Sequence, residues 1–167
     1  MTYRNKIYVA FDGDSDMSYY TMLEAWAKNK NVDFEFYNAH DLNTARDSSK
    51  EESIKRDLRI RFANSKLFIL LIGEHTKNLT KFVKWEIEMA IKLQLPIIAV
   101  NLNDSKTPDK FEPSSLKNQL AIFIPYKLKI INYAINNWPA RDHEHRKNNE
   151  IENYHYIDSV YKKLELD

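Results

Sequence analysis

Short apolar runs alternate with longer amphipathic stretches over most of the chain. Apolar runs of this length, bounded by turn residues, are typical of strands. They predict five strands, at residues 6–11, 32–37, 67–72, 96–101 and 120–125. The run LFILLI at 67–72 has no polar alternation, as expected for a strand that is covered on both faces. Helical periodicity fills the intervals, at 17–29, after Ser49 and Glu52, and from Thr80 onward.

Such an alternation of strands and helices predicts a three-layer α/β fold with a mainly parallel sheet. We expect the flavodoxin-like strand order 2-1-3-4-5 in a single domain that spans residues 1–167. Residues 127–138 and 150–164 predict two C-terminal helices, and the polar segment ARDHEHRKNNE (140–150) predicts a surface linker between them.

Composition narrows the functional classes. With 25 Lys and Arg against 24 Asp and Glu, the chain is nearly neutral and lacks the basic surface of a protein that binds nucleic acid or anionic membranes. It contains no cysteine, so no thiol nucleophile or Cys-containing zinc site can form. No apolar run is long enough to cross a membrane, and MTYRNK does not resemble a signal peptide. The expected protein is therefore cytoplasmic.

The only two glycines, Gly13 and Gly73, follow the first and third predicted strands. They cannot form a dinucleotide fingerprint or a P-loop. In the predicted order these strands are neighbours whose chains leave in opposite directions, which opens a crevice between the segments 12–16 and 73–80. A glycine lets the backbone approach a ligand, although ordinary turn chemistry explains both positions equally well.

The helix after this crevice carries one misplaced charge. At about 100° per residue, Glu86 falls within the apolar arc that Val83, Ile87 and Ala90 share, whereas Glu88 falls on the polar face. A carboxylate that faces a core needs a partner or must be neutral. Glu86 therefore either lines the crevice or is a structural residue held by hydrogen bonds, and the pattern leaves both possibilities open.

An aromatic side chain lies one helical turn before this carboxylate. Phe82 precedes Glu86 by four residues on the same face, so its ring points toward the expected crevice. A ring beside a desolvated carboxylate suits a ligand that combines an aromatic base with a ribose.

Other motifs in the chain give weaker indications. The segment DGDSD at 12–16 resembles the start of a calcium loop, but Met17 and Leu23 replace the required Gly and Glu. A strand followed by Asp-x-Asp also suits an aspartate-nucleophile phosphatase, for which the chain offers no second acidic cluster. His143 and His145 have metal-ligand spacing but fall in the most polar segment, where a solvated loop is the simpler interpretation.

Four segments carry a family resemblance: VAFDGDSD, LFILLIGEHTKN, KFVKWEIEMAI and LPIIAVNLND. They resemble the TIR-like family of bacterial proteins, most closely the TIR subunit of Thoeris antiphage defence. The resemblance covers a core of about residues 4–125 and leaves 127–167 as a helical extension. Enzymatic members have a Trp-x-x-x-Glu motif with a catalytic glutamate. Here Glu86 matches the glutamate, and Phe82 stands where the family has Trp.

The resemblance implies an NAD⁺ glycohydrolase or ADP-ribosyl cyclase, with NAD⁺ as substrate and neither cofactor nor metal. A cyclic ADP-ribose isomer would then act as a diffusible messenger to a Thoeris NADase effector. The implied substrate-binding residues lie in three segments: Phe11, Asp12 and Gly13; Gly73 and Phe82; and Asn38, His40 and Asp41 of the long loop 38–49. In assembled TIR enzymes this loop completes the site across a subunit contact, which implies self-association.

Two other functions remain open at this stage. TIR-like folds also serve as non-catalytic scaffolds that bind a nucleotide or a protein. A nucleoside-transferring enzyme on a similar sheet would act on deoxynucleosides and ignore NAD⁺.

Overall fold

The computed structural model describes residues 5–29, 34–38 and 51–166, with side chains omitted at residues 5 and 34–38. Its main feature is a parallel sheet in the order β2-β1-β3-β4-β5-β6. The predicted order of the first five strands is confirmed. The strands are β1 (Asn5–Ala10), β2 (Phe34–Asn38), β3 (Leu67–Ile72), β4 (Ile97–Asn101), β5 (Ala121–Pro125) and β6 (Asn153–His155).

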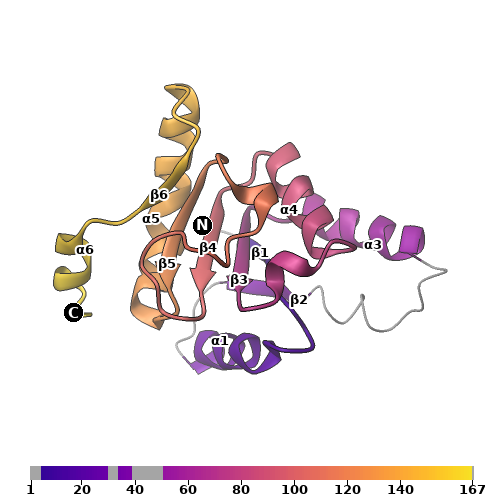
Figure 1. Ribbon diagram of the computed structural model, residues 1–167, viewed down its shortest axis with the longest axis horizontal. Coiled ribbons are helices and arrows are strands. Elements are labelled where there is room, and N and C mark those ends of the chain that lie inside the picture. Colours follow the sequence, from indigo (N-terminus) through magenta and orange to yellow (C-terminus); the bar gives the residue numbers. More distant parts are fainter. Residues whose placement is uncertain (1–4, 30–33, 39–50, 167) are drawn as a thin grey trace.

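Helices cover both faces of the sheet. They are α1 (Met17–Asn29), α3 (Glu51–Ala63), α4 (Val83–Lys92), α5 (Leu128–Lys147) and α6 (Asp158–Lys163), with the short 3₁₀ turns η2 (Thr76–Asn78) and η3 (Ser114–Leu116). Successive strand side chains point to opposite faces, so the sheet feeds two cores. One core packs α1, α5 and α6, and the other packs α3 and α4. Figure 1 shows α1 set apart from α3 and α4 across the sheet.

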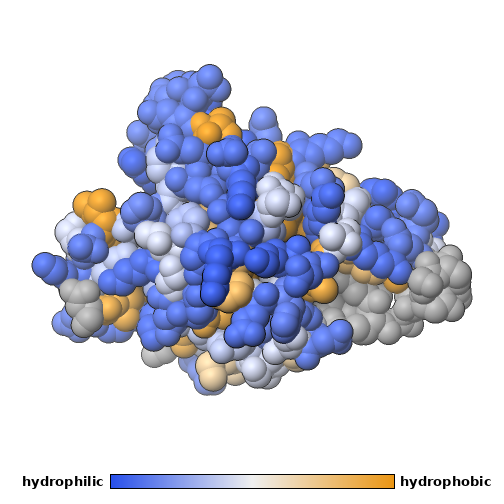
Figure 2. All heavy atoms as spheres, in the orientation of Figure 1, coloured by the Kyte–Doolittle hydropathy of each residue, from blue (hydrophilic) through white to orange (hydrophobic). Residues whose placement is uncertain are grey.

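The central strands are buried along their whole length. All six residues of β3, and all five of β4 and of β5, are buried. This is the environment that the unalternating run LFILLI predicts. The outer surface differs: the face drawn in Figure 2 is mostly hydrophilic, with small scattered hydrophobic spots.

Two C-terminal helices are present, but the prediction of a polar linker after residue 138 was wrong. A single helix, α5, continues through Pro139 and the segment that we expected to be a linker. Proline removes one helix hydrogen bond, but Trp138, Asp142 and His145 recur at helical spacing and are all buried, so packing favours continuation. The many polar residues of this segment hid the helical periodicity of its buried positions.

The region 150–164, expected to be helical, contains a strand before its short helix. Strand β6 pairs in parallel with β5, placing Tyr154 beside Ile122. The amide of Asn153 donates to the carbonyls of Leu116 and Gln119, at 3.2 and 2.8 Å, which fixes the start of this strand. Within the part of the chain that the structure describes, the sheet therefore has six strands rather than five.

Candidate functional site

A cavity of about 360 Å³ lies between the loop that follows β1 and the segment, well after β3, that leads into α4. These strands are hydrogen-bonded neighbours, with Ala10 in register with Leu70. The cavity therefore overlaps the predicted crevice only in part: residues 12–14 and 78–80 line it, whereas Gly73 does not. Its lining comes from two segments, residues 11–14 after β1 and residues 78–83 before and at the start of α4: Phe11, Asp12, Gly13, Asp14, Asn78, Leu79, Thr80, Lys81, Phe82 and Val83.

Phe82 marks the point where α4 begins at this cavity. It occupies the N-cap position without a side-chain cap, so α4 begins later than the start at Thr80 that the sequence predicted. The backbone supplies part of the missing cap, because the Lys84 N–H donates to the Leu79 carbonyl at 3.1 Å. The ring of Phe82 is half-buried, lines the cavity, and has the Lys81 ammonium 5.6 Å from its centre.

The opposite wall is held by local contacts of the loop after β1. Phe11 stacks on Tyr20 of α1 with ring centres 5.0 Å apart and planes 7° apart. Asp12 is buried, and its Oδ1 accepts the backbone N–H groups of Asp14 and Ser15 at 3.0 and 3.3 Å. These turn bonds already engage one oxygen of Asp12. The stacking of Phe11 on Tyr20 and the turn bonds of Asp12 therefore hold this wall in place.

Glu86 lies deeper than we expected. Its side chain is 1% exposed and is absent from the cavity lining, so Phe82 and Glu86 do not face one open cleft. The two residues do lie one turn apart, since the Glu86 N–H donates to the Phe82 carbonyl at 2.8 Å. Because α4 begins at Val83, Glu86 belongs to its first turn, where the positive end of the helix favours a carboxylate.

The partner of this carboxyl group is Tyr8 in the middle of β1. The Tyr8 hydroxyl donates a hydrogen bond to Glu86 Oε2 inside the core between the sheet and α3 and α4. Burial raises the pKa of Glu86 to about 8, and the bond from Tyr8 opposes that rise. Burial and then the Glu86 charge raise the pKa of Tyr8 well above 10. At neutral pH burial therefore keeps Glu86 largely in its protonated form, against the effect of the bond from Tyr8.

Sequence reasoning missed Tyr8. Its ring stacks on Phe62 of α3 with centres 3.8 Å apart, and it also packs on Phe68 of β3. The available signal was its hydroxyl: a tyrosine inside a fully buried strand needs a hydrogen-bond partner, and Glu86 was the other polar group assigned to a core-facing position.

The two glycines serve different purposes. Neither has a positive φ, so left-handed turn geometry explains neither position. Gly13 lines the cavity, where its missing side chain leaves room. Gly73 is buried, and a Cβ added there would lie 2.3 Å from Oδ2 of Asp16. Close approach of another residue therefore requires glycine at position 73.

A model of a known protein family matches a large part of the chain. The family described as Thoeris protein ThsB, TIR-like domain, matches residues 8–107. The chain belongs to this family. The match runs from β1 to the loop after β4, and so includes both walls of the cavity and Glu86. The protein is thus a TIR-like domain of the Thoeris antiphage defence family, and α5, β6 and α6 lie beyond the matched segment.

Three of the residues implied by TIR resemblance cannot be placed at a site. Asn38 is the last residue of β2, in register with Val9, but its side chain lies outside the described part of the structure. His40 and Asp41 fall within 39–50, which also lies outside the described residues. Their contribution to substrate binding therefore stays a prediction.

The histidine pair is not on a solvated loop, contrary to our expectation. Both residues lie on α5, where His143 is exposed and His145 is buried. His145 stacks on Tyr154 with ring centres 4.1 Å apart, and its Nδ1 is 3.0 Å from Oε1 of Glu150. Across the described residues, no group of three His, Asp or Glu side chains is arranged to hold a metal ion. No helix in that part of the chain could span a membrane.

Proposed function

We propose that this TIR-like domain consumes NAD⁺ and makes a cyclic ADP-ribose-type signal that activates a partner NADase effector in antiphage defence. The observation that carries the proposal is the cavity at the β1–β3 crevice, which has Phe82 and Phe11 in its walls and a buried carboxyl group one helical turn behind Phe82. Family membership supports the same class of chemistry.

The proposed reaction breaks the bond between nicotinamide and ribose C1′. The bonding electron pair leaves with nicotinamide, neutralising its ring, and the ribose develops oxocarbenium character. A carboxylate stabilises this positive charge, as in glycoside cleavage. Attack by water, which loses a proton, gives ADP-ribose. Attack by an adenine nitrogen or ribose hydroxyl of the same molecule gives a cyclic isomer.

Glu86 is the proposed carboxylate, and this role requires a change at Tyr8. With a pKa of about 8, Glu86 is mainly neutral at physiological pH and bonded inside the core. Ribose hydroxyls or the nicotinamide cation near its oxygens would favour ionisation and compete with Tyr8. In this proposal, substrate binding or a phage-derived trigger moves the Glu86 side chain toward the cavity. Without the trigger, Glu86 stays bonded to Tyr8 and the enzyme is slow.

The test is to incubate the purified protein with NAD⁺ and an extract of phage-infected cells, then to follow nicotinamide and the second product by mass spectrometry. We expect nicotinamide and a product lighter than ADP-ribose by one water. A filtrate of this reaction should activate a Thoeris NADase effector. Intact NAD⁺ after incubation with extracts from several phages, each shown to trigger a Thoeris system in cells, would contradict the proposal.

The role of the Phe82 ring in the cavity has its own test. Replacing Phe82 by Ala removes the ring from the cavity, and we expect KM for NAD⁺ to rise about tenfold or more, in line with the loss of ~1–3 kcal/mol of base stacking. Phe82→Trp is the matched control, because it restores the residue found in the TIR motif and keeps a flat ring. Equal KM values for Phe82→Ala and wild type would remove Phe82 from the site.

One observation favours a second function. Glu86 is enclosed by Tyr8 in a packed core, as expected for a structural carboxyl group in a non-catalytic scaffold. Such a scaffold would bind a nucleotide or a protein without turnover. Calorimetry with NAD⁺ separates the two functions: a scaffold binds NAD⁺ and returns it unchanged, whereas the enzyme releases nicotinamide on the same preparation.

A further inference from the structure

A second cavity, of about 460 Å³, lies on the other side of the loop that follows β1. Its lining comes from the start of α1, the end of β3 and the loops after β3 and β4: Ser15, Asp16, Tyr19, Ile72, Gly73, Glu74, His75, Leu102, Asn103 and Phe111. Asp14 belongs to the first cavity and Ser15 to the second, so the two cavities are successive along the same loop. The function proposed above does not use this second cavity.

Asp16 is the unusual group in the second cavity. Its side chain is 7% exposed, and its Oδ2 has no hydrogen-bond partner among the described residues. Its backbone is satisfied, because its N–H donates to the Asp12 carbonyl at 2.8 Å and its carbonyl accepts the Tyr19 N–H at 3.1 Å. A buried carboxylate oxygen without a donor is costly. This oxygen has almost no accessible surface and packs against the Gly73 backbone, so a ligand with hydroxyl donors would remove that cost by drawing the carboxyl group toward the cavity.

Gly73 makes this arrangement possible. Because a Cβ at position 73 would lie 2.3 Å from Asp16 Oδ2, any other residue there would displace the carboxyl group. The Gly73 N–H is itself engaged, donating to Thr76 Oγ1 at 2.9 Å. The backbone at Gly73 thus leaves space for the Asp16 carboxyl group. The Gly73 N–H does not donate to that carboxyl group, because it donates to Thr76.

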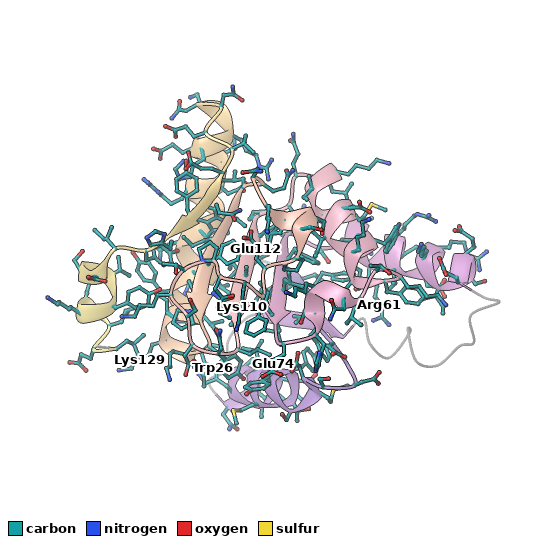
Figure 3. The ribbon with its side chains drawn as sticks, viewed as in Figure 1. Trp26, Arg61, Glu74, Lys110, Glu112 and Lys129 are labelled. Carbon is teal, nitrogen blue, oxygen red and sulfur yellow. The ribbon has the colours of Figure 1, made fainter. Side chains whose placement is uncertain are left out.

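The other polar groups of the cavity are either committed or exposed. The Asn103 amide donates to Asp109 at 2.8 Å, and its Oδ1 accepts the Ser105 N–H at 3.1 Å. Glu74 and His75 are exposed, and Figure 3 shows Glu74 just above α1 on the viewer's side. Asp16 is therefore the buried acceptor that a ligand in this cavity would meet.

Two aromatic rings form fixed walls around it. Tyr19 packs edge-on against Tyr126 at 5.1 Å, and the Tyr126 hydroxyl donates to the Tyr19 carbonyl at 2.7 Å. Phe111 has the ammonium groups of Lys77 and Lys110 at 5.9 and 5.2 Å from its ring centre. The Lys77 ammonium also donates to the Lys110 carbonyl at 3.0 Å, tying the two sides of the rim together.

We propose that this second cavity binds a nucleoside, with Asp16 accepting hydrogen bonds from the 2′ and 3′ hydroxyls of its ribose and with Tyr19 and Phe111 holding the base. A diol supplies the two donors that a carboxylate accepts, and flat rings suit a base. The identity of this nucleoside rests on the proposed function. In that function it is the adenosine half of NAD⁺, while the nicotinamide half reaches the first cavity.

The test uses adenosine and 2′,3′-dideoxyadenosine as probes, with affinities from titrations followed by amide chemical shifts. We expect adenosine to bind wild type and to shift the amides of Gly73 and Phe111, and dideoxyadenosine to bind at least tenfold more weakly. Asp16→Ala should weaken adenosine binding at least tenfold. Ser18→Ala is the matched control, because Ser18 is an exposed polar residue near Asp16 that lines neither cavity, and this variant should bind adenosine like wild type.

Three outcomes would overturn the assignment: no adenosine binding, equal affinity for the two nucleosides, or shifts confined to residues 78–83. The comparison of the two probes uses wild-type protein, so it stands even if Asp16→Ala fails to fold. Adenosine binding without nicotinamide release would reject the proposed function and keep this site. Nicotinamide release without Asp16-dependent adenosine binding would do the reverse.

Discussion

The position of a carboxylate on α4 depends on the side of the helix from which it leaves. Glu88 is exposed, as its place on the polar face predicts, and Glu86 is 1% exposed, as its place on the apolar arc predicts. Periodicity thus located the unusual glutamate correctly. It could not identify Tyr8 as the partner, because that contact joins residues 78 positions apart and depends on the register of β1 against α4.

The buried state of Glu86 predicts a pH dependence of stability. Its pKa rises from 4.5 to about 8 on folding, so between these values the folded protein binds more protons than the unfolded chain. The contribution of this group to the free energy of unfolding is complete below pH 4.5 and is lost as the pH rises through about 8.

We therefore expect wild type to lose more stability than Glu86→Gln between pH 5 and pH 8, by on the order of 3 kcal/mol. Urea unfolding of both proteins at the two pH values measures this difference. Parallel stability curves would show that Glu86 is ionised in the folded protein and that the Tyr8 pair has been misassigned.

At the scale of elements, composition and pattern predicted the strands better than the C-terminal region. The runs that form β1, β3, β4 and β5 are continuous and apolar, so they leave little alternative to a buried strand. The second half of α5 is rich in polar residues and β6 is short, so neither contains a continuous apolar run that indicates its structure. Those two elements depend on tertiary contacts: His145 packs on Tyr154, and Asn153 bonds to the loop before β5.

The central strand gives the simplest stability test. Leu70 is fully buried between β1 and β4 and packs in the core below α3 and α4. Leu70→Ala leaves a cavity that this packed layer cannot close, and we expect a loss of about 2–5 kcal/mol in unfolding free energy. Ile60→Ala on α3 is the control, because Ile60 is 60% exposed. Similar losses for both variants in chemical denaturation would contradict the core assignment.

On the scale of the whole molecule, the segment beyond the family match is built into the fold. The match ends at residue 107, yet Trp138 of α5 and Tyr161 of α6 are buried in the same core as β1 and α1. The sheet also continues past the match through β5 and β6. The C-terminal region is therefore a structural part of this TIR-like domain rather than an appended tail.

This integration predicts that a change in α5 destabilises the protein as one unit. Trp138 is 2% exposed, and replacing a buried Trp by Ala is expected to cost about 3–5 kcal/mol. The exposed Asn136, on the same helix, provides the control variant Asn136→Ala. A single unfolding transition shifted to lower urea concentration is the expected result for Trp138→Ala. An unchanged main transition would show that α5 folds independently of the matched core.

The proposal that the buried glutamate of α4 acts on NAD⁺ is best tested by comparing two glutamates of that helix. Nicotinamide release should be followed with wild type, Glu86→Gln and Glu88→Gln under the same phage-triggered conditions. We expect Glu86→Gln to release at least a hundredfold less nicotinamide than wild type, in line with the ~10² or more attributed to one electrostatic group. Glu88→Gln should match wild type. Equal release by wild type and Glu86→Gln would contradict the proposal.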